Sequence, residues 1–484
     1  MSLKRRTLRN LGAYSIGQLL ATTITQVTMV LLATMIDPAN FGIYSLLFVM
    51  YTLALNTSTA GIDYAAIQSK DDEKTVLITS SSLRLLWTAV AIVAVISFSP
   101  LISEFFQQPA LLLPLVVLAI SLVVPALGFM SLIQLNRDLR FPQLSVSRIA
   151  YAITWSAISL TVAVLFSSYW ALVIALIAGN VVVTAIVLYY APHRIVFHID
   201  KDIAIRLMRF AKFPMMAGLI TFMFFNFDKF IVGSIVGEEP LGAYFLAFTW
   251  GTMMPNIFTN IVNSVMMPTY VKINQDIGTL ARTYLKTLEY LAYVAAPIGF
   301  GVASISSMFV ATVLGPEWTA AIIPLAILSF VGLLLSITSP AGSIFLATGN
   351  PNRTWRMTAV LYLPGVLLMI PAAMYFGVNG VAATILIINF IASLWVLKMA
   401  TDILKEPMKS VGKSLWRPFV AASVMAIIIT LLSTLLTTRL LNLLILIAVG
   451  AIVYSVMIVA LTKGGIISET KSLIQTMLSR KEGG

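Results

Sequence analysis

Residues 42–59 read GIYSLLFVMYTLALNTST, and residues 242–259 read GAYFLAFTWGTMMPNIFT. At this shift of 200 positions, seven of the eighteen residues are identical, and the matches include polar side chains that an apolar composition alone rarely aligns. The identical pairs are Gly42/Gly242, Tyr44/Tyr244, Leu46/Leu246, Phe48/Phe248, Thr52/Thr252, Asn56/Asn256 and Thr59/Thr259. The simplest interpretation is an ancestral duplication that produced two similar halves of the chain.

The composition around this repeat is that of a membrane protein. Of the 484 residues, 59% are hydrophobic and only 10% are charged, and the mean hydropathy is +0.96. A typical soluble domain has roughly 25% charged residues, so a water-soluble fold is excluded. A membrane-spanning helix needs about 20 apolar residues. We therefore predict an all-α polytopic membrane protein with about fourteen spans, near residues 11–36, 41–68, 77–104, 110–136, 142–166, 168–191, 213–236, 240–270, 284–313, 319–347, 354–376, 378–400, 416–436 and 440–462.

The repeat and the spans together predict the domain organisation. Because an even number of spans separates the two copies, each copy enters the membrane in the same direction, with a pseudo-twofold axis along the membrane normal. We therefore predict a first lobe and a second lobe of six spans each, joined by a basic cytoplasmic linker and followed by a pair of additional spans with a cytoplasmic tail. The predicted boundaries are 1–191 for the first lobe, 192–212 for the linker, 213–400 for the second lobe and 401–484 for the remainder.

The distribution of charge predicts the orientation. The chain has 31 lysine and arginine residues and a formal net charge of +12. All of these basic residues except Lys229 and Arg439 lie near the termini or around the even-numbered loops between the predicted spans, which share one side of the membrane. Such a bias places both termini in the cytoplasm, in a plasma membrane that the chain crosses many times. The positive charge therefore indicates contact with anionic lipid headgroups rather than with nucleic acid. The basic N-terminus leads into an apolar segment without a small-residue cleavage site, which indicates a retained first helix.

Other features limit the possible chemistry. The chain has no cysteine, so disulfides and thiol chemistry are excluded. His193 and His198 lie in the predicted linker, where solvated loop residues are more common than metal ligands, and we predict neither a metal nor a cofactor. The predicted outside loops are short, which leaves no room there for a catalytic domain.

Polar residues form a stripe on one face of the second predicted span. Thr52, Asn56, Thr59 and Asp63 are spaced by four, three and four residues, and the equivalent stripe in the eighth span is Thr252, Asn256, Thr259 and Asn263. Unpaired polar groups are costly against lipid, so both stripes are predicted to face protein or water. The alternative is hydrogen bonding between helices, but the pairing of the two stripes favours the wall of a cavity shared by the lobes. Cysteines at these positions would then react with a water-soluble maleimide.

Two further spans contribute candidate binding residues. Gln26 lies in the first span, and the seventh span holds Asn226, Asp228 and Lys229. The charge of Lys229 lies within an apolar stretch and requires water, a counter-ion or substrate. Adjacent helical residues point about 100° apart, so we predict that Asp228 and Lys229 do not pair optimally with each other. The alternative function of Lys229 is a structural ion pair with a neighbouring helix.

Three arginines lie just inside predicted spans at the cytoplasmic side. Each of Arg84, Arg148 and Arg356 can extend to the lipid headgroups on its own. As a group they would make the mouth of an inward-facing cavity attractive to phosphate. Our hypothesis is that Lys229, assisted by these arginines, holds the phosphates of an anionic cargo, so that Lys229→Gln abolishes transport without lowering the protein level. Proton or sodium exchange through Asp228 or Asp63 remains open.

Two motifs carry a resemblance to a known family. They are LLATMIDPANFGIY over residues 31–44, and FDKFIVGSIVG over residues 227–237 followed by LGAY at 241–244; GNP at 349–351 also fits. With its fourteen predicted spans, the whole chain resembles the polysaccharide transporter (Wzx-type) branch of the multidrug/oligosaccharidyl-lipid/polysaccharide exporter superfamily. The motifs are structural, so the resemblance assigns a role to no particular residue.

The resemblance implies a flippase rather than an enzyme. Such a protein moves polyprenyl-pyrophosphate-linked oligosaccharide from the inner to the outer leaflet. We predict a monomer that works by alternating access, with lipid-linked oligosaccharide, membrane lipids and a coupling proton or sodium ion as its partners. One alternative is a cation-coupled multidrug exporter of the same superfamily, which usually has twelve spans and an acidic cavity. The other is a membrane-embedded polysaccharide polymerase or glycosyltransferase, which normally needs catalytic carboxylates on sizeable outside loops.

Overall fold

The computed structural model describes the backbone of residues 3–59, 61–69, 71–194, 196–348 and 352–463. Within these ranges, side chains are described except at 3–16, 213–214, 217, 220–221, 224, 254–265, 268, 352–359 and 361–363. The described part of the chain is helical throughout its regular structure and contains no β-strand, so the predicted all-α class is confirmed.

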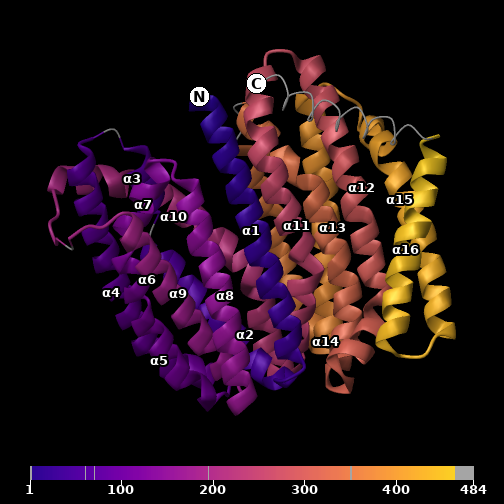
Figure 1. Cartoon of the computed structure of the whole chain (residues 1–484), viewed down its shortest axis with the longest axis horizontal. Helices are drawn as coiled ribbons and strands as arrows, with labels where there is room; N and C mark the ends of the chain where they lie inside the picture. Colours follow the sequence, from indigo (N-terminus) through magenta and orange to yellow (C-terminus); the bar gives the residue numbers. More distant parts are fainter. Residues whose placement is uncertain (1–2, 60, 70, 195, 349–351, 464–484) are drawn as a thin grey trace. The chain divides into compact units, whose positions relative to one another are not determined.

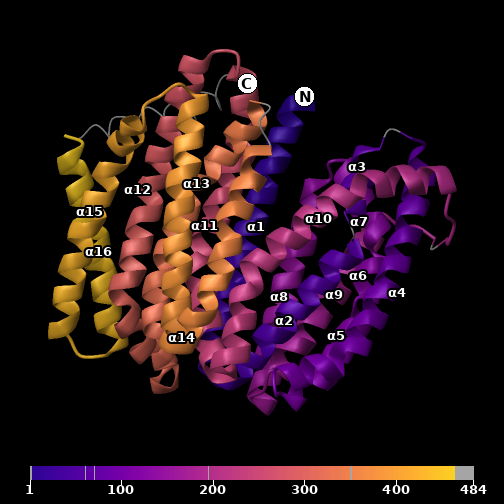
Figure 2. The same cartoon turned by 180° about the vertical axis from the view of Figure 1, so that it is seen from behind.

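The chain divides into two compact units. The first comprises Met1–Phe245 with Ala373–Val378, and the second comprises Leu246–Ala372 with Asn379–Gly484. The helices of the first unit are α1 (Leu3–Ala33), α2 (Pro38–Thr59), α3 (Ile62–Gln68), α4 (Glu73–Phe105), η1 (Pro109–Leu111), α5 (Leu112–Ser121), α6 (Val123–Leu127), α7 (Phe129–Arg137), α8 (Phe141–Phe166), α9 (Trp170–Tyr190), α10 (Lys201–Ile231) and the π-turn η2 (Val232–Val236). Within this unit, α8 packs against α1 and α9, whereas α10 packs against α2, α3 and α4 (Figures 1 and 2).

Helix α11 (Glu238–Ile273) begins in the first unit and continues into the second. The remaining helices are α12 (Ile277–Phe309), the π-turn η3 (Val310–Leu314), η4 (Pro316–Ala321), α13 (Ile322–Ala347), α14 (Asn352–Ile403), α15 (Met408–Leu435) and α16 (Leu440–Leu461). Here α12 packs against α13 and α15, and the C-terminal pair α15 and α16 run side by side (yellow in Figure 1).

Each predicted span coincides with one of these helices or with a short series of them. Ten helical segments of the described residues are long and apolar enough to cross a membrane, and Gly17–Ala33 of α1 is a shorter apolar segment. The eleventh and twelfth predicted spans are the two halves of α14, which is broken at Gly377 (φ 57°, ψ −144°). The number of spans is therefore approximate, but the multi-pass membrane architecture is confirmed.

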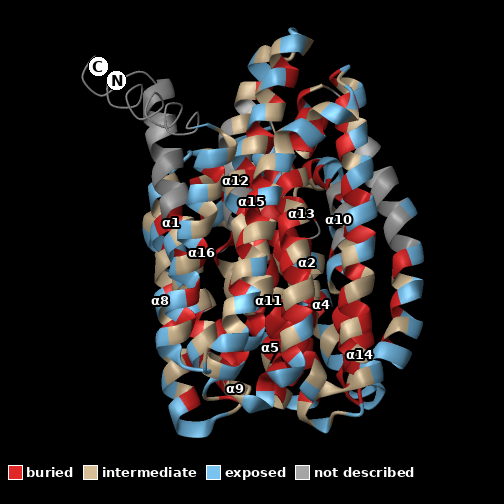
Figure 3. Ribbon diagram, turned by 90° about the vertical axis from the view of Figure 1, so that its right-hand side faces the viewer, coloured by how far each residue is buried: buried red, intermediate tan, exposed pale blue. Residues whose placement is uncertain are grey.

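Burial distinguishes central helices from peripheral ones. In α2 with α3, and in η4 with α13, 56% of the most apolar window is buried, compared with 22% in α16 and 17% in α4. Figure 3 shows the difference as largely red segments on α13 and mixed pale blue and tan segments on α16. Apolar side chains that remain exposed on the peripheral helices are consistent with contact with lipid, where exposed apolar surface has no cost.

The repeat found in the sequence is visible at the start of α2 and α11. These helices begin at Pro38 and Glu238, which are equivalent positions of the two copies. Their first turns cross so closely that a Cβ atom on Gly42 would lie 1.8 Å from the carbonyl oxygen of Glu238, and one on Gly242 would lie 1.8 Å from that of Pro38. The contact is reciprocal, as expected for two segments related by a twofold axis. The two lobes and their boundaries stay a prediction of the sequence.

The second predicted span is not one continuous helix. Helix α2 ends at Thr59, and Gly61 has a left-handed conformation (φ 68°, ψ 10°) before α3 begins at Ile62. Glycine adopts this conformation without the steric cost that a Cβ atom would add. The break changes the direction of the chain between Asn56 and Asp63, two residues of the predicted polar stripe.

Aspartates cap three helices at the end where basic residues concentrate. The side chains of Asp72, Asp200 and Asp276 accept hydrogen bonds from the backbone N–H groups of Thr75, Ile203 and Thr279, respectively. The hydrogen bonds from Thr75 lower the pKa of Asp72, and those from Thr279 lower the pKa of Asp276. The ionised carboxylate is the better acceptor, so each cap stabilises the fold most when it is charged.

We expect the caps formed by Asp72 and Asp276 to stabilise the fold less as the pH is lowered. Because the folded pKa lies below the ordinary value of about 3.9, the stabilisation is complete above roughly pH 5 and is lost as the pH falls through the folded pKa. In the Asp72→Asn/Asp276→Asn variant, asparagine still caps, so the melting temperature in detergent should be close to wild type at pH 7 and fall less between pH 5 and pH 3. The Asp72→Ala/Asp276→Ala variant should melt a few degrees lower at pH 7. Identical pH profiles for wild type and the asparagine variant would contradict this account.

Candidate functional site

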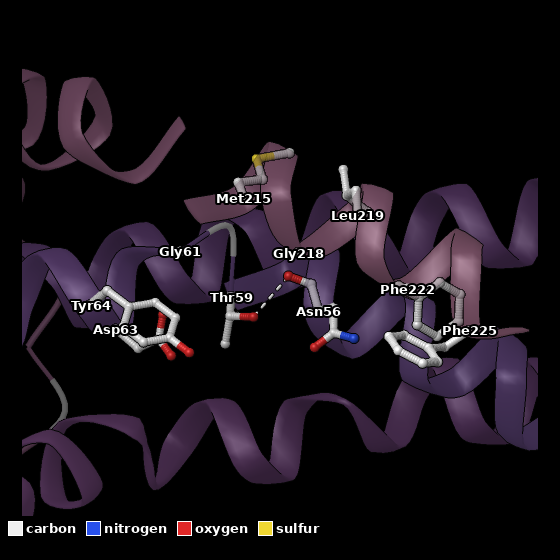
Figure 4. Close-up of a pocket in the computed structure, with 10 residues that line it drawn as sticks. All are labelled: Asn56, Thr59, Gly61, Asp63, Tyr64, Met215, Gly218, Leu219, Phe222 and Phe225. Carbon is white, nitrogen blue, oxygen red and sulfur yellow. Dashed lines mark hydrogen bonds between the residues drawn. The ribbon is translucent and has the colours of Figure 1, made fainter. Parts of the chain in front are cut away.

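A polar cavity in the first unit lies between α2, α3 and α10. Its volume is about 530 Å³, within the roughly 300–1,000 Å³ typical of small-molecule sites. Helices α2 and α3 and the bend between them contribute Asn56, Thr59, Gly61, Asp63 and Tyr64, and α10 contributes Met215, Gly218, Leu219, Phe222 and Phe225 (Figure 4). We refer to these ten residues as the α2–α10 pocket. One wall is polar and the opposite wall is apolar and aromatic.

Three residues of the predicted polar stripe lie on the polar wall, whereas the cavity shared by the two lobes stays a prediction. Asn56, Thr59 and Asp63 line the pocket, whereas the Thr52 hydroxyl donates to the carbonyl oxygen of Phe48 (2.7 Å) within its own helix. Thr252, its equivalent, donates in the same way to Phe248 (2.7 Å). The matching stripe in α11 is untested, because the side chains of Asn256 and Asn263 lie outside the described residues.

Hydrogen-bonding capacity remains available on the polar wall. The Thr59 hydroxyl donates to Asn56 O (2.8 Å) and Leu55 O (3.1 Å), so its proton is used within α2. In contrast, Oδ1 of Asp63 is buried with no hydrogen-bond partner in the described structure, and the side chain of Asn56 is exposed. Because both residues line the cavity, the amide of Asn56 and the carboxylate of Asp63 can bond to a polar ligand there.

Arg84 is fully enclosed by protein. It is only 2% exposed, its Nη1 donates to Leu55 O (3.4 Å), and its guanidinium lies 5.8 Å from the centre of the Phe129 ring. No carboxylate of the described residues lies within salt-bridge distance of it, and its Nε has no hydrogen-bond partner there. Arg84 therefore does not extend to lipid headgroups. It contacts the turn of α2 that carries Asn56 without lining the α2–α10 pocket.

Asp228 and Lys229 form a buried ion pair, so the prediction that these neighbours do not pair well was wrong. Lys229 Nζ lies 3.2 Å from Oδ1 and 3.4 Å from Oδ2 of Asp228, and it also donates to Phe225 O (3.1 Å). The Tyr244 hydroxyl donates to Asp228 Oδ2 (2.7 Å). Both charged residues are almost completely buried. The long lysine side chain folds back along α10, which overcomes the divergence of adjacent helix positions.

A second polar cavity lies within the same unit, between α1, α7, α8 and α9. Its volume is about 470 Å³. Arg148 lines it and donates a hydrogen bond to Gln18 Oε1. The other polar lining residues are Thr22, Thr25, Asn136, Ser147 and Tyr151. Neither cavity is lined by Lys229 or Arg84, so the structure does not gather the predicted cationic residues in one described pocket.

The remaining predicted site residues have local roles or lie outside the description. The amide of Asn226 donates to Phe222 O (2.9 Å), one turn earlier in α10. Oε1 of Gln26 is buried with no hydrogen-bond partner among the described residues. The side chain of Arg356 lies outside the described residues.

Sequence reasoning missed the second wall of the α2–α10 pocket. Met215, Leu219, Phe222 and Phe225 recur at helical spacing on α10, but apolar residues in an apolar span give no signal that distinguishes a pocket from packing. His193 in the linker is bonded through Nδ1 to the Ser131 hydroxyl (2.9 Å). Among the described residues, no group of three or more His, Cys, Asp or Glu is placed to hold a metal ion.

Comparison with known proteins gives similar membrane proteins. The lipopolysaccharide biosynthesis protein WzxC of Escherichia coli (strain K12) is 26% identical over 428 residues, which cover 87% of this chain and 86% of the relative. The teichuronic acid biosynthesis protein TuaB of Bacillus subtilis (strain 168) is 28% identical over 371 residues, covering 74% and 75%.

Solved structures show the same fold at low identity. The inward-closed lipid II flippase MurJ aligns with a TM-score of 0.76 and 16% identity, covering 94% of this chain and 99% of that one. An inward-facing multidrug resistance MATE family transporter of the MOP superfamily aligns with a TM-score of 0.59 and 16% identity, covering 82% and 99%. These similarities confirm the predicted fold.

A family assignment follows from a match over more than half of the chain. Residues 31–323 match the family described as "Polysaccharide biosynthesis protein", and this range contains both repeat copies and the α2–α10 pocket. The resemblance seen in the sequence is therefore confirmed, and the chain belongs to the polysaccharide biosynthesis protein family.

Proposed function

We propose that the chain is a flippase that moves polyprenyl-(pyro)phosphate-linked oligosaccharide from the cytoplasmic to the outer leaflet for surface polysaccharide biosynthesis. The observation that carries the proposal is a polar pocket walled by spanning helices in a member of the polysaccharide biosynthesis family. A glycan and its phosphates cannot cross hydrocarbon without compensation, because each unsatisfied polar group costs several kcal/mol there. A cavity within a helical bundle removes this cost.

Related proteins support the type of cargo. WzxC and TuaB are named for the biosynthesis of lipopolysaccharide and teichuronic acid, and MurJ is named as a lipid II flippase. Alternating access fits a repeat whose helices α2 and α11 meet at reciprocal glycines. The proposal also includes cytoplasmic termini, supported by the distribution of basic residues, together with a monomeric state and coupling to a proton or sodium ion.

An inside-negative membrane potential favours the proposed direction. Moving negative charge outward gains roughly 2.3 kcal/mol per net charge per 100 mV, so a diphosphate cargo can use the potential as a driving force. Lipid contact is part of the proposal, because apolar residues such as Leu431 and Leu441 are more than half exposed on α15 and α16.

Reconstitution of the full chain tests the proposal. Proteoliposomes should accelerate the movement of a fluorescent polyprenyl-diphosphate oligosaccharide to the outer leaflet, measured by its accessibility to a membrane-impermeant quencher. We expect at least a tenfold increase over protein-free vesicles.

The structural similarity to a multidrug transporter makes drug efflux the second candidate function. The same vesicles should then be assayed with a fluorescent cationic drug under proton and sodium gradients. Drug transport without lipid movement would replace the flippase proposal by an exporter, whereas chain-length changes in the labelled glycan would indicate a polymerase.

A further inference from the structure

We propose that the α2–α10 pocket binds an uncharged sugar residue of the cargo and excludes its phosphates. This inference rests on the proposed function, and it separates the site for the glycan from the site for the diphosphate. It differs from a general cargo site because it specifies which part of the substrate the pocket accepts.

The two walls of the pocket match the two kinds of surface on a sugar ring. Asn56 and Asp63 present amide and carboxylate groups on one side, and Phe222 and Phe225 present aromatic rings on the other (Figure 4). Sugar hydroxyls donate and accept hydrogen bonds at the ring edge, whereas the ring face carries C–H groups that pack on aromatic side chains. Ligand sites generally combine an apolar lining with a few polar groups that fix orientation.

The available hydrogen bonds specify what the ligand must supply. Asp63 lines the pocket with a carboxylate, which accepts hydrogen bonds only, so a ligand that supplies O–H or N–H groups fits it. A carboxylate accepts from two adjacent hydroxyls at once, and hydrogen bonds to charged acceptors are stronger than those between neutral groups. The Thr59 oxygen retains acceptor capacity after donating to the backbone of α2.

The charge of the pocket excludes phosphate. Among the ten described lining residues, Asp63 is the one acidic residue and none is a lysine or an arginine. Like charges repel more strongly in the low dielectric of a protein interior than in water. A phosphate, or a sugar acid such as a uronate, would meet this repulsion in addition to losing its hydration.

A coupling cation fits the geometry less well than a sugar does. A bound calcium ion takes about six to eight oxygen ligands, whereas the described lining of the pocket offers the single carboxylate of Asp63. The aromatic wall would also contribute nothing to a cation held by oxygen atoms.

The absence of native cysteine allows a direct test with a single introduced thiol. Gly218 lines the pocket, and a Cβ atom there would have no neighbour within 4 Å, so Gly218→Cys is accommodated. Gly412→Cys on α15 is the matched control, because Gly412 is also exposed with no neighbour within 4 Å of its Cβ position. The full chain is held in a sugar-free detergent, and the rate of reaction with a water-soluble maleimide is measured.

Three amphiphiles with the same alkyl chain serve as probes: an alkyl glucoside, an alkyl glucuronide and an alkyl phosphate. The glucoside should slow the labelling of Gly218→Cys at least threefold, the two anionic probes should not, and no probe should change Gly412→Cys. Adding Asp63→Asn to Gly218→Cys should allow the glucuronide to protect as well, because the repulsion is removed. This gain of binding cannot result from misfolding.

Several outcomes would overturn the inference. They are equal protection by the phosphate, protection by sodium ions alone, and no protection by the glucoside. Failure here with normal lipid movement in proteoliposomes refutes the sugar pocket and leaves the flippase proposal in place. Protection by the glucoside without any lipid movement supports the sugar pocket and refutes the flippase proposal.

Discussion

Lys229→Gln is expected to destabilise the fold by about 3–5 kcal/mol, the usual cost of removing one partner from a buried ion pair. The substitution leaves the carboxylate of Asp228, which is 2% exposed, without the ammonium group 3.2 Å away. The hydrogen bond from Tyr244 remains, but one neutral donor does not compensate a buried charge. The amount of folded protein in the membrane should therefore fall, in contrast to the intact level expected from the sequence.

The matched control removes both charges. In Asp228→Asn/Lys229→Gln, the asparagine carbonyl can still accept from Tyr244, and no unpaired charge is left behind. Replacing both members of a buried pair is often close to neutral, so most of the loss should be recovered. The measurement is the melting temperature of detergent-solubilised protein, together with its level in the membrane.

The same variants decide the function of Lys229. If Lys229→Gln is as stable as wild type but no longer moves lipid-linked oligosaccharide, the pair is not structural and Lys229 serves the cargo. If the double variant recovers both stability and lipid movement, neither charge is needed for binding phosphate. The structure favours the second result, because Nζ of Lys229 is bound by Asp228 and by the backbone of Phe225.

The sequence was sufficient for the helical architecture because spans depend on length and hydropathy. An apolar run as long as residues 142–166 satisfies its backbone hydrogen bonds in a membrane by forming a helix, and α8 occupies Phe141–Phe166. The polar stripe was visible in the sequence because its period is local, but the period applies only as far as the end of α2 at Thr59. The break at Gly61 was not predictable, since a glycine in an apolar run is compatible with either a continuous or a broken helix.

Contacts between segments far apart in the chain could not be predicted from the sequence, because they depend on how the helices pack against each other. The apolar wall of the α2–α10 pocket consists of residues that are indistinguishable from packing residues until the neighbouring helix is placed. Arg148 and Gln18 are 130 positions apart, and their hydrogen bond depends on how α1 packs against α8. The pairing of Asp228 with Lys229 depended on a side-chain rotamer, which the helical periodicity of the backbone does not determine.

Replacing Gly42 or Gly242, where α2 and α11 cross, should also lower the stability of the fold strongly. A methyl group at Gly42 would lie 1.8 Å from the backbone oxygen of Glu238, and one at Gly242 would lie 1.8 Å from that of Pro38. A backbone atom cannot rotate away as a side chain does, so α2 and α11 must separate at their first turns. We expect Gly42→Ala and Gly242→Ala each to lose at least the roughly 1–3 kcal/mol typical of overpacking.

Two other helical glycines provide the controls. A Cβ atom on Gly342 in α13 or on Gly412 in α15 meets no atom within 4 Å. Alanine is the better helix former by about 1 kcal/mol, so Gly342→Ala and Gly412→Ala should be neutral or slightly stabilising. A comparison of the four single variants therefore separates the crowding at the crossing from the general effect of replacing glycine.

The double variant Gly42→Ala/Gly242→Ala tests whether the two glycines act at one crossing. If separation of α2 from α11 relieves both clashes, the second substitution adds little once the first has moved the helices apart, and the combined loss is clearly smaller than the sum of the two single losses. Independent sites would give additive losses in melting temperature and membrane level. Additive losses, or single variants that melt like the Gly342→Ala and Gly412→Ala controls, would show that the reciprocal contact does not hold the two copies of the repeat together.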